Sequence, residues 1–491
     1  MTTPSPQGTL RSFPRVFWVA NVMELFERAA YYGLNSVLAI YLTISIASGG
    51  LGFSEESVGF LQGVVYALTY IIPILGGALA DRYGYRKVLL VALTLLSVGY
   101  FISGQMTTYA AVFMGLAVMA TGAGLFKPII SGTIARSTTE ANSGFGFGIY
   151  YWMINLGAFL APIVVNQLKG ISWQLVFLAS ALYVAAMLLP AFFLYRDPPK
   201  PESTKKVREV LSGAAMVLGD ARFMLMIFVY SGFWILYFQN FGTVLWFLRD
   251  FVDASPVNAI FASLGLNVTF DAEFVTTINA GTIILLQVVV SRLVRNFPAL
   301  PTMVLGMALG TLGFVCLAFA STVWLFVLGI VVFSIGEMTA HPKYYSYVGL
   351  VAPPDKKAVY MGYAFLYGVI GSLIGSTLGG AMYESLLKPF VGQPDVAAIY
   401  RSFWLTFAGI GGVAIAGLFL YNRTLSADTA ATRRAARRVM YGVYAVLTIL
   451  GAWFFYDAVF AGAVVKYKTV VQASIMLLLG IGGWLVMRRS K

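Results

Sequence analysis

Long apolar stretches alternate with short polar turns along almost the whole chain. Each of fourteen stretches is close to or longer than the about 20 residues that a helix needs to cross the hydrocarbon core of a bilayer. These stretches lie near residues 15–47, 57–80, 87–105, 108–135, 144–167, 173–194, 223–249, 272–294, 301–320, 322–350, 358–387, 402–422, 437–460 and 469–487. The pattern therefore predicts an all-α polytopic membrane protein with fourteen transmembrane helices.

The polar interruptions divide these spans into groups of six, six and two. We expect a cytoplasmic N-terminal tail (1–14), an N-terminal six-helix bundle (15–195), a cytoplasmic inter-bundle linker (196–221), a C-terminal six-helix bundle (222–423), and a basic linker with two additional transmembrane helices (424–491). Two six-helix bundles joined by a linker resemble the plan of the major facilitator superfamily. In that fold the substrate binds between the halves, near the middle of the membrane.

Composition and charge agree with a membrane protein. Hydrophobic residues make up 59% of the chain and charged residues 11%, whereas soluble proteins carry about a quarter charged residues. Most of the 33 lysines and arginines fall on the cytoplasmic side when both termini are placed there, as the positive-inside rule requires. The net charge of +13 therefore indicates orientation in the cell (plasma) membrane, next to the lipid bilayer. Nucleic acid is not an expected partner.

The residue types that catalysis and metal binding require are scarce. A single cysteine, Cys316, excludes an internal disulfide framework, and a single histidine, His341, excludes a multi-histidine metal site. No nucleotide-binding loop and no Ser/His/Asp arrangement is present in the sequence. We therefore expect no enzyme activity, no cofactor, no metal and no catalytic residues.

The first span carries an unusual polar stripe. At helical spacing one face would hold Glu24, Glu27, Arg28, Tyr31, Tyr32 and Asn35. Ionisable groups at membrane depth are costly and usually face a cavity. Two carboxylates share one guanidinium here, so we expect one acid to take up a proton readily and the group to act as a proton switch. The alternative is a static buried ion pair that fixes helix packing.

Other spans place polar side chains near mid-membrane. They are Lys127, Asn155, Asn279, Glu337 and His341. Cations in the first half and an acid in the second would suit a zwitterion with separate carboxylate and ammonium groups. The alternatives are that Lys127 extends to the membrane surface, that Asn155 forms only an interhelical hydrogen bond, and that His341 is hydrogen-bonded without carrying protons.

Several motifs resemble those of the proton-dependent oligopeptide transporter family. They are ELFERAAYYG (24–33), GAGLFKP (122–128) and GIYYWMINLGA (148–158), together with the tenth-span spacing of Glu337, Pro342, Ser346, Ala352 and Pro353. A further motif, GGALADRYGYRK (76–87), is similar to one common to the whole superfamily. The resemblance runs through both halves to about residue 421.

This resemblance implies a proton-coupled symporter that takes up di- and tripeptides by alternating access. It implies proton coupling by Glu24, Glu27, Arg28 and Glu337, with His341 as a possible relay. It implies substrate binding by Arg28, Tyr32, Tyr70, Lys127, Asn155, Asn279 and Glu337. The implied partners are a small peptide substrate, protons and the lipid bilayer.

The chain also departs from the family pattern. Phe238 replaces an acid before Gln239, Ala280 replaces a proline after Asn279, and His341 replaces a serine. These differences leave open a proton-coupled transporter of a non-peptide organic anion, amino-acid derivative or drug-like molecule. The additional C-terminal helix pair leaves open a membrane sensor or scaffold.

Overall fold

The structure, a computed structural model, describes residues 10–139, 142–197, 213, 216–353, 356–460 and 467–489. Thirteen helices in these ranges are long and apolar enough to cross a membrane. The first span is not among the thirteen because Glu24, Glu27 and Arg28 interrupt its apolar sequence. With it, the described helices agree with the fourteen predicted spans. The predicted tail 1–14 and linker 196–221 lie largely outside the described residues, so the proposed boundaries stay predictions.

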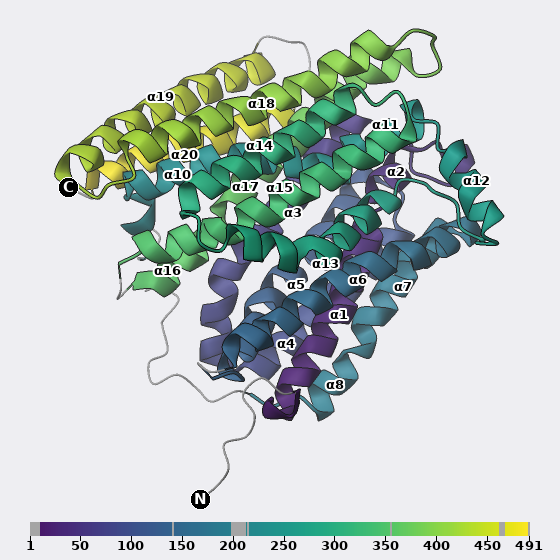
Figure 1. Ribbon diagram of the computed structural model, residues 1–491, viewed down its shortest axis with the longest axis horizontal. Coiled ribbons are helices and arrows are strands. Elements are labelled where there is room, and N and C mark those ends of the chain that lie inside the picture. Colours follow the sequence, from purple (N-terminus) through teal and green to yellow (C-terminus); the bar gives the residue numbers. More distant parts are fainter. Residues whose placement is uncertain are drawn as a thin grey trace, which may run out of the picture.

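The first half of the chain folds as one helical bundle (Figure 1). Its helices are α1 (Arg15–Asn35), α2 (Leu38–Thr43), α3 (Glu55–Tyr83), α4 (Tyr85–Gln105), α5 (Tyr109–Arg136), α6 (Ser143–Ile171), α7 (Trp173–Ala186) and α8 (Leu188–Phe193). α4 packs against α5 and α7, α3 packs against α5, and α1 packs against α6 and α7.

The second half forms another bundle, followed by the additional pair. Its elements are α10 (Ala221–Tyr237), the 3-10 turn η3 (Phe238–Phe241), α11 (Thr243–Phe251), α12 (Ser255–Ser263), α13 (Phe274–Val294), α14 (Ala299–Ala318), α15 (Val323–Val351), α16 (Lys357–Tyr363), α17 (Leu366–Met382), the π-helical η5 (Tyr383–Leu387), η6 (Lys388–Phe390) and α18 (Ala397–Thr424). α14 packs against α15 and α18, and α10 packs against α17 and α18.

Four spans that the sequence predicts as continuous are broken in the structure. The span 223–249 becomes α10, η3 and α11, and the spans 15–47, 173–194 and 358–387 are broken as well. At the first of these breaks the Gln239 side-chain amide donates to the carbonyl oxygens of Ile235 (2.7 Å) and Gly375 (2.9 Å). Side-chain donors can thus satisfy backbone groups that the interrupted helix leaves free.

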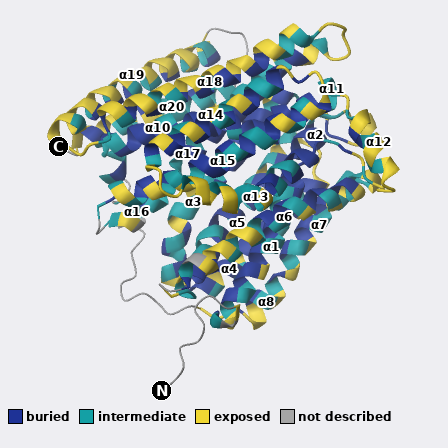
Figure 2. Cartoon of the chain, viewed as in Figure 1, coloured by how far each residue is buried: buried dark blue, intermediate teal, exposed yellow. Residues whose placement is uncertain are grey.

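The additional pair, α19 (Ala430–Phe460) and α20 (Tyr467–Arg489), lies at the edge of the molecule (Figure 1). The two helices pack against each other, and α19 packs against α10. In Figure 2 buried residues concentrate where the bundles meet, whereas the pair is largely exposed. Only 17% of the most apolar part of each helix is buried, so most of its surface is not covered by the rest of the protein.

Candidate functional site

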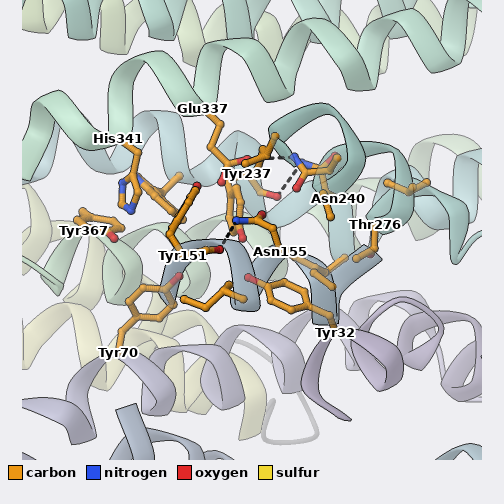
Figure 3. Close-up of a pocket in the computed structure, with 18 of the residues that line it drawn as sticks. Tyr32, Tyr70, Tyr151, Asn155, Tyr237, Asn240, Thr276, Glu337, His341 and Tyr367 are labelled. Atoms are coloured by element: carbon orange, nitrogen blue, oxygen red, sulfur yellow. Dashed lines mark hydrogen bonds between the residues drawn. The ribbon is translucent and has the colours of Figure 1, made fainter. Parts of the chain in front are cut away.

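A cavity of about 180 Å³ lies between the two bundles. α1, α3, α5 and α6 line it from one side, and α10, η3, α13, α15 and the α16–α17 segment line it from the other. Seven predicted site residues are among its lining residues: Tyr32, Tyr70, Lys127, Asn155, Asn279, Glu337 and His341. Figure 3 shows Glu337 and His341 on the side opposite Tyr32 and Tyr70. A polar cavity at the interface of two bundles is where membrane transporters hold their substrates.

The cationic side of the cavity is formed by Lys127 on α5. Its Nζ atom lies 5.0 Å from the centre of the Tyr70 ring, a distance at which the ring face attracts a cation. The side chain lines the cavity instead of extending to the membrane surface. Among the described residues no carboxylate oxygen lies within 4.0 Å of the Lys127 Nζ atom. Its charge is therefore available to an anionic ligand group.

The acidic side is formed by Glu337 on α15. Its Oε2 atom accepts a hydrogen bond of 3.1 Å from the Asn279 side-chain amide, which also donates to the Ser334 hydroxyl at 2.9 Å. The amide therefore orients the carboxylate, and the described residues provide no ion-pair partner for it. Lys127 and Glu337 thus present opposite charges from opposite bundles.

His341 and Asn155 occupy less decisive positions. The His341 Nδ1 atom lies 3.3 Å from the Tyr230 hydroxyl, and its ring centre is 5.0 Å from that of Trp234. In the described part of the chain no hydrogen bond joins His341 to Glu337, so the relay stays a prediction. Asn155 donates to the Tyr151 carbonyl oxygen on its own helix at 2.9 Å and lines the cavity with its polar head.

Several lining residues are missing from the sequence prediction. They are Tyr151, Trp234, Tyr237, Asn240, Thr276, Tyr345, Phe365 and Tyr367. Helical spacing would have identified two of them, Tyr151 and Tyr345. Tyr151 lies four residues before Asn155, and Tyr345 lies eight residues after Glu337, so each shares a helix face with a predicted residue. Trp234 and Tyr237 face the cavity beside the break after α10, which no periodicity indicates. The aromatic wall they form suits the apolar parts of a small ligand.

The first-helix charges form a buried cluster behind the cavity. The Arg28 guanidinium bonds the Glu27 carboxylate, and its Nε atom lies 3.5 Å from Glu24 Oε1. The exposed fractions of the Arg28, Glu24 and Glu27 side chains are 5%, 2% and 0%. Arg28 also lies 5.8 Å from the centre of the Tyr32 ring. Arg28 is not among the lining residues of the cavity, because its guanidinium turns toward the two carboxylates, whereas Tyr32 is among them. Substrate binding by Arg28 stays a prediction.

One guanidinium does not satisfy both carboxylates. Within the described residues Glu24 Oε2 and Glu27 Oε1 are buried without a hydrogen-bond partner. An unpaired buried polar atom costs about 1–3 kcal/mol, and a bound proton would relieve that cost. The tight packing of α6 on this helix confines the cluster. A Cβ atom at Gly157 would lie 2.7 Å from the Leu25 carbonyl oxygen and 3.2 Å from Arg28 Cβ.

Ion pairs between the bundles occur at one end of the molecule, which we call the outer end; it carries α11, α12 and the start of α13 (Figure 1). Glu55 on α3 lies 3.5 Å from Arg249 and bonds Lys388 at 2.5 Å. At the same end Lys169 on α6 bonds Asp271 and Glu273. We call these six residues the outer clasp. Among the described residues no ion pair joins the bundles at the other end, so the ionic contacts between the bundles are confined to the outer end.

Close backbone contact also joins the two bundles near the outer end. α3 meets α17 at Gly59 and Gly380, and a Cβ atom on Gly59 would lie 2.4 Å from the Ser376 carbonyl oxygen and 2.9 Å from Gly380 Cα. Small residues allow two helix backbones to approach this closely in a membrane. The contact between the bundles at the outer end therefore has two parts: close packing of helix backbones, and the ion pairs of the outer clasp.

Replacing Glu55 by glutamine is expected to loosen the outer end. The change removes the buried negative charge that faces Arg249 and Lys388. Both cations then lose their ion pair with this side chain, which weakens the contact between the bundles. With Cys316 replaced by serine and Asn240 by cysteine in the cavity, an impermeant maleimide applied from outside should react several-fold faster in Glu55→Gln. The control is Glu56→Gln, an exposed neighbour. Equal labelling of both variants would contradict the assigned role of Glu55.

The second part of the outer clasp is expected to respond to pH. Burial raises the pKa of the Glu273 carboxyl above its ordinary value, while Lys169 opposes that shift. Glu273 therefore gains a proton at a higher pH than an ordinary carboxyl as the solution is acidified, and its ion pair with Lys169 is lost. The same maleimide labelling should accelerate on acidification, after correction for thiolate fraction, and Glu273→Gln should flatten that dependence.

Two helical bundles around a central polar cavity, within an apolar exterior, define a membrane protein of the transporter class. The family model of the Major Facilitator Superfamily matches residues 25–270 and 251–489. The chain therefore belongs to the Major Facilitator Superfamily and is an integral membrane protein.

Individual relatives and a solved structure show which transporters this chain is similar to. The chain is 26% identical over 269 residues to the di-/tripeptide transporter of Lactococcus lactis subsp. lactis, which covers 52% of this chain and 50% of that protein. It is 30% identical over 175 residues to dipeptide and tripeptide permease B of Salmonella typhimurium, covering 34% and 35%. The chain thus spans about half or less of the length of these relatives. A crystal structure of the peptide transporter POT in complex with sulfate shares the fold, with a TM-score of 0.70, 20% identity and coverage of 84% and 95%.

Proposed function

We propose that this chain is a proton-coupled symporter that takes up di- and tripeptides by alternating access. The observation that carries the proposal is the cavity between the bundles, with Lys127 on one side and Glu337 held by Asn279 on the other. A short peptide carries a carboxylate and an ammonium at its two ends, and both find an opposite charge there. The names of the curated relatives, a di-/tripeptide transporter and a dipeptide and tripeptide permease, support the same substrate class.

Proton coupling would come from the first-helix cluster. Binding energy drives a conformational change only if it differs between the two states. A proton on Glu24 or Glu27 would release part of the Arg28 guanidinium, and the neighbouring Tyr32 ring would transmit that shift to the cavity wall. Opening of the outer clasp and closure of the opposite end would then expose the cavity alternately to the two sides. The protein would lie in the plasma membrane with both termini in the cytoplasm.

Uptake of labelled dialanine into proteoliposomes tests this function. One proton per peptide and an inward pH gradient of one unit would support at most about tenfold accumulation, because one pH unit corresponds to about 1.4 kcal/mol. We expect accumulation above equilibrium that collapses when a protonophore removes the gradient. Uptake that never exceeds equilibrium would contradict coupling.

A non-peptide zwitterion is the second candidate, because the cavity is small and His341 adds an imidazole to its wall. Thermal unfolding with dialanine, trialanine and a free ω-amino acid separates the two. Stabilisation by the peptides supports the peptide transporter. Stabilisation by the amino acid alone would favour the second candidate.

A further inference from the structure

The end of the α19–α20 pair that lies opposite the outer end, which we call the inner end, carries a dense group of arginines. The transport cycle described above gives these arginines no role. Four lie in the first turns of α19 and two end α20: Arg433, Arg434, Arg437, Arg438, Arg488 and Arg489. The Arg437 guanidinium donates to the Met487 carbonyl oxygen, which joins the two helix ends. We call these six residues the arginine patch.

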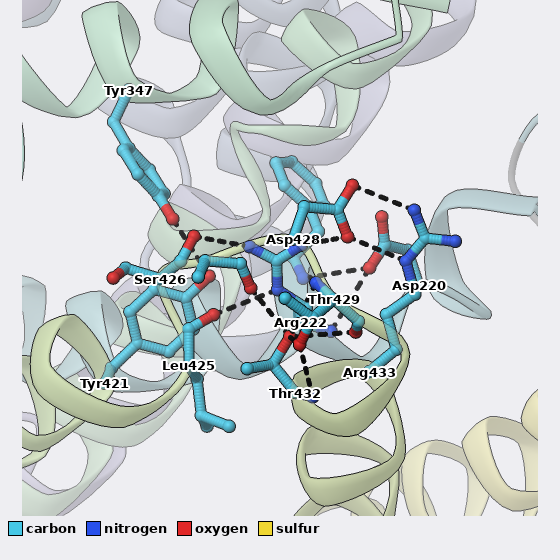
Figure 4. Close-up of polar contacts among 12 residues, drawn as sticks. Asp220, Arg222, Tyr347, Tyr421, Leu425, Ser426, Asp428, Thr429, Thr432 and Arg433 are labelled. Atoms are coloured by element: carbon cyan, nitrogen blue, oxygen red, sulfur yellow. Dashed lines mark hydrogen bonds and ion pairs between the residues drawn. The ribbon is translucent and has the colours of Figure 1, made fainter.

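Little acidic charge balances the arginine patch. Asp428 bonds Arg433 and Arg222, each at 2.7 Å (Figure 4), and Arg433 keeps the pKa of that carboxyl below its ordinary value. Among the described residues no acidic side chain lies within 4.0 Å of Arg434 or Arg438. Both are exposed, so the patch keeps an excess of positive charge at its surface.

The helix lengths place the arginine patch at the level of the lipid headgroups. α19 has 31 residues and is about 46 Å long at 1.5 Å per residue, whereas the hydrocarbon core is about 30 Å thick. The arginine-bearing first turns therefore extend beyond the core. Nearby, the Arg488 guanidinium lies 5.5 Å from the centre of the Trp484 ring, which is 41% exposed. Exposed tryptophans are typical of the membrane–water interface.

We propose that the arginine patch binds the phosphate-bearing headgroup of an anionic phospholipid in the inner leaflet. Guanidinium groups bind phosphate through paired hydrogen bonds, and the positive end of the α19 dipole adds to their field. Apolar side chains continue the surface toward the membrane centre, with Val439 48% and Val446 55% exposed. An amphiphile would use both the charged and the apolar part, whereas a free phosphate would use only the first.

Native mass spectrometry of the full chain with added phosphatidylglycerol or phosphatidylcholine tests this site. Each arginine that contacts the bound headgroup should contribute about fivefold to binding of anionic lipid. Arg434→Gln/Arg438→Gln should therefore weaken phosphatidylglycerol binding by about 25-fold and leave phosphatidylcholine binding unchanged. The control is Arg292→Gln/Arg295→Gln, a double replacement of exposed arginines at the end of α13, and it should stay within about twofold of the unmodified chain.

Three outcomes would overturn the lipid site. They are equal losses in the two double variants, equal retention of both lipids by the unmodified chain, and displacement of phosphatidylglycerol by millimolar inorganic phosphate. The last would indicate a soluble-anion site. Unchanged melting temperatures in both variants would exclude misfolding as the cause of a selective loss.

Discussion

Replacing Arg28 by lysine is expected to lower pH-gradient-driven dialanine uptake by about a hundredfold while leaving dialanine exchange at equal pH largely intact. Arg28 contacts both Glu24 and Glu27 within a cluster that is almost fully buried. Lysine keeps the charge but lacks the planar fork that engages two carboxylates at once. Loss of contact with one buried carboxylate costs several kcal/mol, and the protonation of that acid would no longer be linked to Arg28.

Measuring both exchange and accumulation of dialanine separates proton coupling from substrate binding. Exchange requires only binding and rocking of the bundles, whereas accumulation requires the proton. Arg82→Lys, at an exposed position, is the matched control and should behave as the unmodified chain. If Arg28→Lys still accumulates dialanine normally, the cluster is a static ion pair. If exchange and accumulation fall together, Arg28 serves substrate binding or folding instead.

The second large effect is expected at the two charged walls of the cavity. Hydrogen bonds to a charged group contribute about 1.5–3 kcal/mol. Lys127→Gln should therefore weaken dialanine binding about ten- to hundredfold and barely affect dialanine amide, which lacks the carboxylate. Glu337→Gln should weaken dialanine similarly and barely affect N-acetyl-dialanine. Binding is measured by isothermal titration calorimetry on the purified protein.

Lys343→Gln serves as the control for both changes. Lys343 lies on the same helix as Glu337, but its Nζ atom donates to the carbonyl oxygens of Arg295 (3.3 Å) and Phe297 (2.8 Å), outside the cavity. Its replacement should leave all three ligands unaffected. The assignment of the two walls fails if Lys127→Gln weakens dialanine and its amide equally, because the lost contact would then not involve the peptide carboxylate.

Sequence reasoning predicts the fold well because membrane spans are read from length and hydropathy alone. The helical period also places Glu337 and His341 on one face of α15, and both line the cavity. The sequence does not reveal which way the Arg28 side chain turns. Its guanidinium could face either the cavity or the two carboxylates of its own helix, and only the packed structure decides between them. The sequence also does not reveal the break after α10, where Gln239 bonds backbone carbonyl groups of two helices.

The outer clasp illustrates a further limit of sequence reasoning. Glu55 and Lys388 are 333 residues apart, and each resembles an ordinary charged residue at a loop. In the sequence three cations of the outer clasp stand at or just beyond the ends of predicted spans, as many charged residues do; they are Lys169, Arg249 and Lys388. Their pairing becomes visible only when the two bundles are placed together, because ion pairs between distant segments leave no periodic pattern.

The most direct test of the account is a measurement of proton entry driven by peptide alone. Proteoliposomes with a pH dye inside and no imposed pH gradient receive dialanine from outside, with the membrane potential clamped. We predict that dialanine acidifies the lumen. N-acetyl-dialanine amide should cause no acidification, and dialanine should cause none with the Arg28→Lys variant. Entry of labelled dialanine without any change in lumen pH would contradict proton coupling by the first-helix cluster.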